Sequence, residues 1–261
     1  MTIPDNPTFA LLADHGVEYL PPPKPAPLDS FQVFGERCSG TSYVERLIAK
    51  NTPLSATRRY GWKHGFPTML AIPSSVLVVG VVRHAIDWTL SLYSRPWHSK
   101  KQLQKQDYSG FIRTPWHSYV DRMDYFHGSS ADDLGQPLLL DRHPITGTAF
   151  ANILDMRQAK LASLLAWRRR GVALMLVRYE LVRDDPWAVL HGMKQCFNLA
   201  GARSIFRPVR KRLGTKFHPL ISQRAPRPNY PNQDDLTYIL SRLDHTQEAS
   251  CGYFYAHPKT N

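Results

Sequence analysis

Residues 31–51 read FQVFGERCSGTSYVERLIAKN. The first four residues form a short apolar run typical of a β-strand, and the following loop, GERCSGTS, contains two glycines. Beyond the loop, Tyr43, Leu47 and Ile48 recur at helical spacing. The stretch therefore predicts a strand, a loop and a helix in succession.

Further strands and helices alternate after this stretch. Residues 74–82 (SSVLVVGVV) are continuously apolar and rich in β-branched side chains, as expected of a central strand buried on both faces. Residues 172–180 predict another strand. Helices are predicted over 85–93, 150–170, 185–201 and 234–244. This alternation predicts an α/β fold of three layers, with a central, mostly parallel sheet flanked by helices.

The chain divides into a tail and one domain. Residues 1–30 end in PPPKPAP and predict a proline-rich tail on the surface. Residues 31–261 predict a single α/β domain. Within it, residues 94–148 are rich in His, Lys, Arg, Trp, Pro and Gly and have weak periodicity, with a possible short helix near 116–126. We interpret this stretch as a lid or insertion on the acceptor side of a binding site.

Composition narrows the functional classes. The 261 residues include 33 Lys and Arg against 21 Asp and Glu, a net charge of +12, which favours anionic ligands: nucleic acid, a lipid surface or a small molecule with several phosphate-like groups. A surplus that only maintains solubility is the alternative. Three widely spaced cysteines do not fit a disulfide framework or a zinc finger. The longest apolar run, 76–82, is far below the roughly 20 residues of a membrane span, so we expect a soluble cytoplasmic protein with no membrane span.

The loop from Gly35 to Ser42 matches the phosphate-loop template GxxxxGK[ST] at every fixed position but one, where Thr41 replaces lysine. Such a loop can surround an anion with backbone N–H groups at a helix N-terminus. The missing lysine argues against hydrolysis of a nucleoside triphosphate. The alternative is a tight glycine turn that binds no ligand.

Two elements of the sequence resemble the sulfotransferase family. Ser39, Gly40, Thr41 and Ser42 resemble its SGTT loop, and an arginine at the end of the central strand, Arg83, is followed eight residues later by Ser91. The arginine leaves the sheet edge where α/β proteins bind ligands, and about two helical turns return the serine to the same side. Looser similarity extends over residues 31–255.

This resemblance implies a P-loop NTPase-like fold and a sulfuryl donor, 3′-phosphoadenosine 5′-phosphosulfate (PAPS). The 5′-phosphosulfate would lie in the loop, and Arg83 and Ser91 would bind the 3′-phosphate. No metal is expected. The residues assigned to the donor are Cys38, Ser39, Gly40, Thr41, Ser42, Tyr43, Arg83 and Ser91.

The segment Trp62–Pro67 (WKHGFP) resembles a shortened form of the family's Lys-Thr-His-Leu-Pro type segment. It makes Lys63 a candidate for stabilising the bridging oxygen and His64 a candidate general base. An ordinary loop histidine is the alternative for His64. Many family members carry lysine where this chain has Cys38, and a cation, Arg37, comes one place earlier. Either Arg37 reaches the transferred group or Lys63 acts alone.

The expected activity is sulfuryl transfer to a hydroxyl or amine of a small molecule or glycan, with no nucleic-acid partner. Two alternatives remain. A nucleotide or small-molecule kinase of related fold would need a loop lysine and carboxylates for magnesium. A basic nucleic-acid-binding module is favoured by the charge and by the basic, aromatic stretches 95–102 and 207–218. For the acceptor, cations in 94–148 suit an acidic molecule, while its Trp and Tyr side chains suit a ring.

Overall fold

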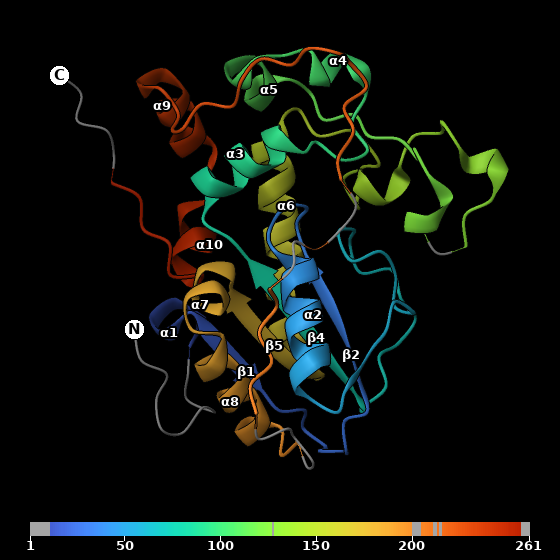
Figure 1. The fold of residues 1–261 in the computed structure, drawn as a ribbon, viewed down its shortest axis with the longest axis vertical. Coiled ribbons are helices and arrows are strands. Elements are labelled where there is room, and N and C mark those ends of the chain that lie inside the picture. Colours follow the sequence, from blue (N-terminus) through green and yellow to red (C-terminus); the bar gives the residue numbers. More distant parts are fainter. Residues whose placement is uncertain (1–10, 127, 200–204, 211–212, 214–215, 257–261) are drawn as a thin grey trace.

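The computed structural model describes residues 11–126, 128–199, 205–210, 213 and 216–256. Its centre is a five-stranded sheet in the order β1-β5-β4-β2-β3 (Figure 1). All pairs in this sheet are parallel except β1 with β5. The predicted α/β class and mostly parallel sheet are therefore confirmed. The strands are β1 (Val17–Leu20), β2 (Ser30–Gly35), β3 (Ser55–Ala56), β4 (Val76–Val82) and β5 (Ala173–Arg178).

Helices cover both faces of the sheet, and the alternation of side chains along β4 shows how. Leu77 and Val79 pack with the apolar residues of α2 (Thr41–Asn51) and α8 (Pro186–Cys196). Val78 packs on the opposite side with α6 (Ile153–Leu165). Every residue of β4 is buried, as the continuous apolar run predicts for a central strand.

Two of the helices begin directly after a residue whose side chain caps them. Asn152 caps α6 by accepting hydrogen bonds from two first-turn N–H groups, and Asp185 caps α8, which has proline in its first turn. The predicted helices near 85–93 and 234–244 are α3 (Ala85–Ser94) and α9 (Gln233–Arg242). The predicted helix over 185–201 ends earlier, at Cys196, and residues 200–201 lie outside the described residues.

The N-terminal segment corrects the expectation of a surface tail. After the short helix α1 (Leu12–His15), residues 17–20 form β1, which pairs antiparallel with β5. Val17 and Tyr19 are fully buried, and the Tyr19 hydroxyl donates to the Val189 carbonyl at 2.7 Å. The prediction of a tail is thus wrong for residues 12–20, because this short strand covers an edge of the sheet. Residues 1–10 of the predicted tail lie outside the described residues.

The region 94–148 consists of short helices and 3-10 turns joined by extended segments. The predicted helix near 116–126 is wrong: Trp116 and Ser118 are buried and His117 is exposed, the alternation of an extended chain. Isolated bridges join Trp116 to Phe150 and Tyr119 to Pro137. The elements are α4 (Lys101–Gln104), α5 (Tyr108–Arg113) and the 3-10 turns η2 (Met123–Tyr125), η3 (Ala131–Asp133) and η4 (Leu139–Asp141).

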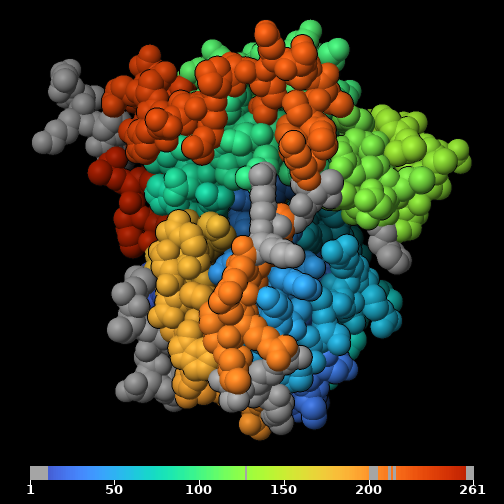
Figure 2. All heavy atoms as spheres, viewed as in Figure 1, coloured from blue at the N-terminus to red at the C-terminus, as the bar shows by residue number. Residues whose placement is uncertain are grey.

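After β5 the chain forms further helices and then a segment that lies beside α2. A short helix, α7 (Tyr179–Asp184), replaces the last two residues of the predicted strand over 172–180. Residues 205–210 lie along α2, where Asn51 makes hydrogen bonds in both directions with the backbone of Arg207 (Figure 2). The helix α10 (His245–Ser250) precedes the C-terminal segment. Among the described helices, none has the length and apolar character needed to cross a membrane.

Candidate functional site

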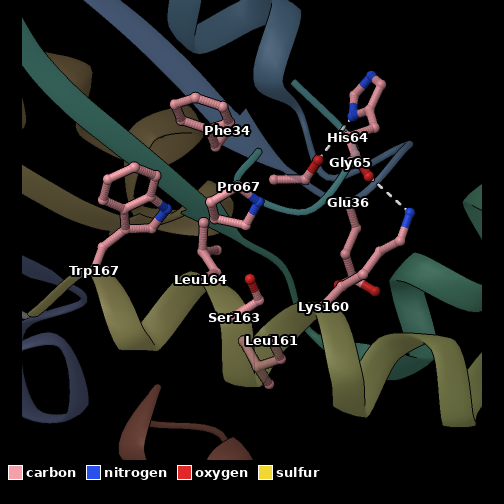
Figure 3. A pocket seen from close by; sticks show the side chains of 11 residues that line it. Phe34, Glu36, His64, Gly65, Pro67, Lys160, Leu161, Ser163, Leu164 and Trp167 are labelled. Carbon is pink, nitrogen blue, oxygen red and sulfur yellow. Dashed lines mark hydrogen bonds between the residues drawn. The ribbon is translucent and has the colours of Figure 1, made fainter. Parts of the chain in front are cut away.

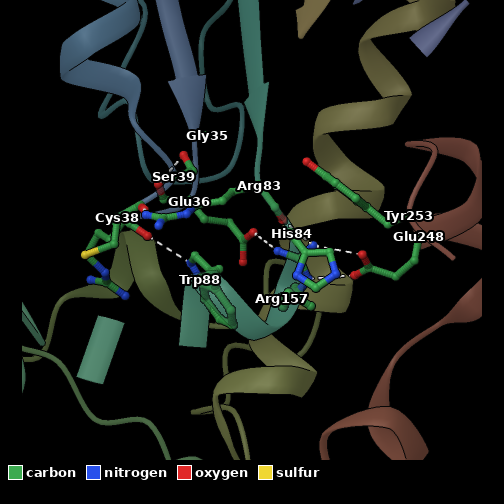
Figure 4. A network of polar contacts seen from close by, with 12 residues as sticks. Gly35, Glu36, Cys38, Ser39, Arg83, His84, Trp88, Arg157, Glu248 and Tyr253 are labelled. Atoms are coloured by element: carbon green, nitrogen blue, oxygen red, sulfur yellow. Dashed lines mark hydrogen bonds and ion pairs between the residues drawn. The ribbon is translucent and has the colours of Figure 1, made fainter. Parts of the chain in front are cut away.

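The loop after β2 and the end of β4 meet at one edge of the sheet. The chain passes from β2 to β3 on one side of β2 and then to β4 on its other side. At such a reversal in strand order the connecting loops separate and leave a crevice at the carboxyl ends of the strands, where α/β proteins bind ligands. The loop residues 36–40 and Arg83 both lie at this edge (Figure 4).

The loop has a tight backbone conformation. Cys38 and Gly40 both adopt positive φ, 64° and 94°. Ser39 turns inward, and both its hydroxyl and its N–H donate to the Glu36 carbonyl, at 2.7 and 3.2 Å. Because Gly40 is the N-cap of α2 and has no side chain, no capping group covers the first turn of the helix. The positive end of the α2 dipole therefore lies at this edge of the sheet without a side-chain cap.

Arg83 and Ser91 reach the loop, as the sequence predicts. Arg83 Nη1 donates to the Cys38 carbonyl at 2.8 Å, and Ser91 lies beside the Cys38 thiol, where it opposes the burial that raises the pKa of that thiol. The Arg83 guanidinium also stacks over the Tyr179 ring, 4.9 Å from its centroid. Its Nε is buried and has no hydrogen-bond partner among the described residues. An arginine and a hydroxyl thus converge beside the loop, which is a suitable arrangement for an anion.

Tyr179 is a residue of this site that the sequence analysis missed. Its ring packs directly on Gly40, since a Cβ built on that glycine would lie 2.1 Å from Tyr179 Cδ2. The same ring meets Tyr43 edge to face at 6.3 Å. Tyr179 follows β5 as Arg83 follows β4, and this shared sheet edge was the signal that could have found it.

Lys63 lies over the first turn of α2. Its Nζ donates to Ser42 Oγ at 3.0 Å and is 3.6 Å from Glu45 Oε2. Burial lowers the pKa of Lys63, and the Glu45 carboxylate opposes that shift. The predicted cation is thus beside the predicted anion-binding turn.

His64 is held by the backbone of β2. Its Nδ1 is 2.7 Å from the Gly35 carbonyl oxygen (Figure 3). Because a carbonyl can only accept, Nδ1 carries the hydrogen in the neutral ring and Nε2 is the basic nitrogen. Burial, together with the neighbouring Lys63 cation, holds the pKa of His64 well below its ordinary value, so the ring is neutral at pH 7.

A pocket opens behind His64, between the segment after Trp62 and α6 (Figure 3). Its cavity volume is only about 20 Å³, room for about one water molecule, and it is partly open to solvent. Lys160 donates to the His64 carbonyl at 2.7 Å at one end of it. The pocket is lined by Phe34, Gly35, Glu36, His64, Gly65, Pro67, Lys160, Leu161, Ser163, Leu164 and Trp167. It therefore lies on the side of β2 that faces α6, opposite the side covered by α2.

Arg37 does not lie where a replacement for the loop lysine is needed. Its side chain is 2% exposed and points inward to Asp141, with Nη2 2.6 Å from Oδ2. The guanidinium also packs on Trp116, 4.6 Å from the ring centroid. The expectation of a catalytic Arg37 is therefore corrected: a buried ion pair fixes it in the protein interior, whereas Lys63 and Arg83 are cations beside the loop.

Asp141 is the centre of this buried cluster and was also missed from the sequence. It accepts hydrogen bonds from Trp116 Nε1 at 2.5 Å and Ser118 Oγ at 2.8 Å, and it pairs with Arg37 and Lys160. Burial alone would raise its pKa, but the two cations hold the pKa of Asp141 well below its ordinary value. The region 94–148 is thus joined to the loop after β2 and to α6.

A second buried network supports the loop from beneath (Figure 4). Arg157 on α6 pairs with Glu36 in the loop and with Glu248 on α10, each at 2.6 Å. Trp88 Nε1 donates to the Arg37 carbonyl at 2.9 Å. Glu180 accepts from the His84 N–H at 3.0 Å and from the Tyr253 hydroxyl at 2.7 Å. The loop is therefore pre-formed by buried contacts.

No protein-family model matches this sequence, and a search of curated proteins finds no match. Among the residues that the structure describes, no three His, Cys, Asp or Glu side chains form a group that could hold a metal ion.

Proposed function

We propose that this protein is a sulfotransferase that moves a sulfuryl group from PAPS to a hydroxyl or amine of a small molecule or glycan. The observation that carries the proposal is the convergence of Arg83, Ser91 and Lys63 on one loop at the N-terminus of α2. Two separated cations suit a ligand with anionic groups at two ends. This is the charge distribution of a donor with a 3′-phosphate and a 5′-phosphosulfate.

In this proposal, each end of the donor has its own partners. The 5′-phosphosulfate binds to backbone N–H groups of the loop and the first turn of α2, with Lys63 above Ser42. Arg83 and Ser91 bind the 3′-phosphate. The absence of a lysine at Thr41 argues against a triphosphate in the same P-loop-like turn.

The transfer needs an in-line displacement and one proton acceptor. The acceptor oxygen or nitrogen attacks sulfur, the bond from sulfur to the bridging oxygen breaks, and adenosine 3′,5′-bisphosphate leaves. His64 Nε2 takes the acceptor proton, since the ring is neutral and Nδ1 is occupied by the Gly35 carbonyl. Lys63 stabilises the charge that develops on the bridging oxygen.

The acceptor would lie on the side of the region 94–148. Trp97 and Tyr125 stack with ring centroids 6.0 Å apart, and the Arg122 guanidinium packs on both rings. The His98 ring contacts both Trp97 and Tyr125, and Trp62 contacts His98 on one side and His64 on the other. A ring with an acidic substituent fits these side chains. The three cysteines, which lie far apart in the sequence, suit a reducing, cytoplasmic compartment.

The test is a comparison of melting temperatures with different nucleotides. A ligand present at 100 times its Kd stabilises the folded state by about 2.7 kcal/mol, which raises Tm by roughly 5–10 °C for a chain of this size. We expect this shift with adenosine 3′,5′-bisphosphate and a smaller one with ADP. A larger shift with ATP and magnesium, and none with the bisphosphate, would favour the kinase; a shift only with an oligonucleotide would favour the nucleic-acid-binding module.

A further inference from the structure

Glu45 lies on α2 beside Lys63, and no sequence pattern assigns it a role. Lys63 Nζ is 3.6 Å from Glu45 Oε2 and donates to Ser42 Oγ at 3.0 Å. Ser42 and Glu45 are three positions apart on the helix, so their side chains lie on the same side of it. The two contacts hold the ammonium group over the first turn of α2.

We propose that Glu45 is a positioning residue that holds the Lys63 ammonium over the anion-binding turn of α2. The inference rests on the proposed function, in which Lys63 faces the group to be transferred. A carboxylate this close to an anion site repels the ligand. The same carboxylate restricts a flexible lysine side chain, of which only 21% is exposed, to the side of the helix where the anion binds.

The charged and titratable groups around Lys63 come from three segments. Glu45 belongs to α2, Arg58 to the loop after β3, and His64 follows Lys63 in the chain. Arg58 Nη2 lies 3.4 Å from Glu45 Oε1, and 73% of the Arg58 side chain is exposed. Glu45 raises the pKa of Lys63 and Arg58 lowers it. Substitutions of Glu45 and Arg58 should therefore shift the pKa of the Lys63 amine in opposite directions.

The experiment measures the reactivity of the Lys63 amine in the free protein. Only the unprotonated amine reacts with acetic anhydride, so acetylation of the Lys63 peptide, followed by mass spectrometry between pH 7 and 10, reports its pKa. Glu45→Gln should speed acetylation at pH 8 by roughly twofold to tenfold, the range expected for a partly exposed ion pair. Arg58→Gln should slow it, and Glu45→Asp should stay close to wild type.

Asp184→Asn is the matched control, because Asp184 is an exposed carboxylate that pairs only with the adjacent Arg183 among the described contacts. The pH profile of Lys63 acetylation in Asp184→Asn should equal that of wild type. An unchanged acetylation profile in Glu45→Gln would overturn the inference, whatever the result for Arg58→Gln. Adenosine 3′,5′-bisphosphate should protect Lys63 of the wild-type protein from acetylation. A lack of protection would count against the proposed function, while the profiles of the free protein would still decide the role of Glu45.

Discussion

Replacing Gly40 with alanine should destabilise the protein through two separable effects. The residue has φ of 94°, a left-handed conformation that costs an L-amino acid about 1–2 kcal/mol. The new Cβ would also lie 2.1 Å from Tyr179 Cδ2. The ring cannot move without disturbing Arg83, which stacks on it at 4.9 Å, and overpacking of this kind typically costs about 1–3 kcal/mol. We therefore expect a total loss of about 2–5 kcal/mol.

Urea unfolding of two further variants separates these effects. Gly135 has φ of 82° and no atom within 4 Å of the position that a Cβ would occupy, so Gly135→Ala should lose only the conformational part. In a double-mutant cycle, Tyr179→Ala should remove the clash and yield a coupling energy of about 1–3 kcal/mol with Gly40→Ala. If Gly40→Ala costs no more than Gly135→Ala, the proposed contact between the loop and the Tyr179 ring is refuted.

Four further predictions concern the site. Arg83→Ala should lose about 2 kcal/mol of affinity for adenosine 3′,5′-bisphosphate, measured by calorimetry, and less for 5′-AMP; equal losses would remove Arg83 from the 3′-phosphate. His64→Ala should lower kcat by roughly 10² to 10⁴ and leave the donor Kd near wild type, whereas full turnover would place the base elsewhere. Asp141→Asn should cost about 3–5 kcal/mol at pH 7 by urea unfolding, because it leaves two buried cations short of a partner. Since the pKa of Asp141 is lowered in the folded state, its stabilisation is present above about pH 4 and lost as pH falls further, so the difference between the two proteins should shrink in acid. Thr41→Lys should not hydrolyse ATP in a phosphate-release assay; hydrolysis would favour the kinase.

The parallel core of the fold follows from local sequence signals. The continuous apolar run gives β4, and the capping residues Asn152 and Asp185 give the starts of α6 and α8. The edge strand β1 was missed because four residues, VEYL, provide too short a pattern, and its pairing with β5 depends on a partner more than 150 residues away. Residues 116–120 were misassigned because their alternating burial depends on Asp141 and Phe150, which sequence spacing does not bring near.

The positions of some site residues, but not of others, could also be predicted from local sequence spacing. Sequence spacing was sufficient to predict that Arg83 and Ser91 lie on the same side of the sheet edge, beside the loop, because a strand end and two turns of helix fix both positions. It was insufficient for Arg37, since a charge next to a ligand loop can turn outward to the anion or inward to a buried carboxylate. In the structure Arg37 turns inward, and the buried carboxylate that it meets is Asp141, from the region 94–148. The lowered pKa of Asp141 keeps this carboxylate ionised beside Arg37. A cation near a loop is therefore evidence for an anion site only after its own buried partners are known, and by that criterion Lys63, with its partly exposed partners Ser42 and Glu45, is the stronger candidate.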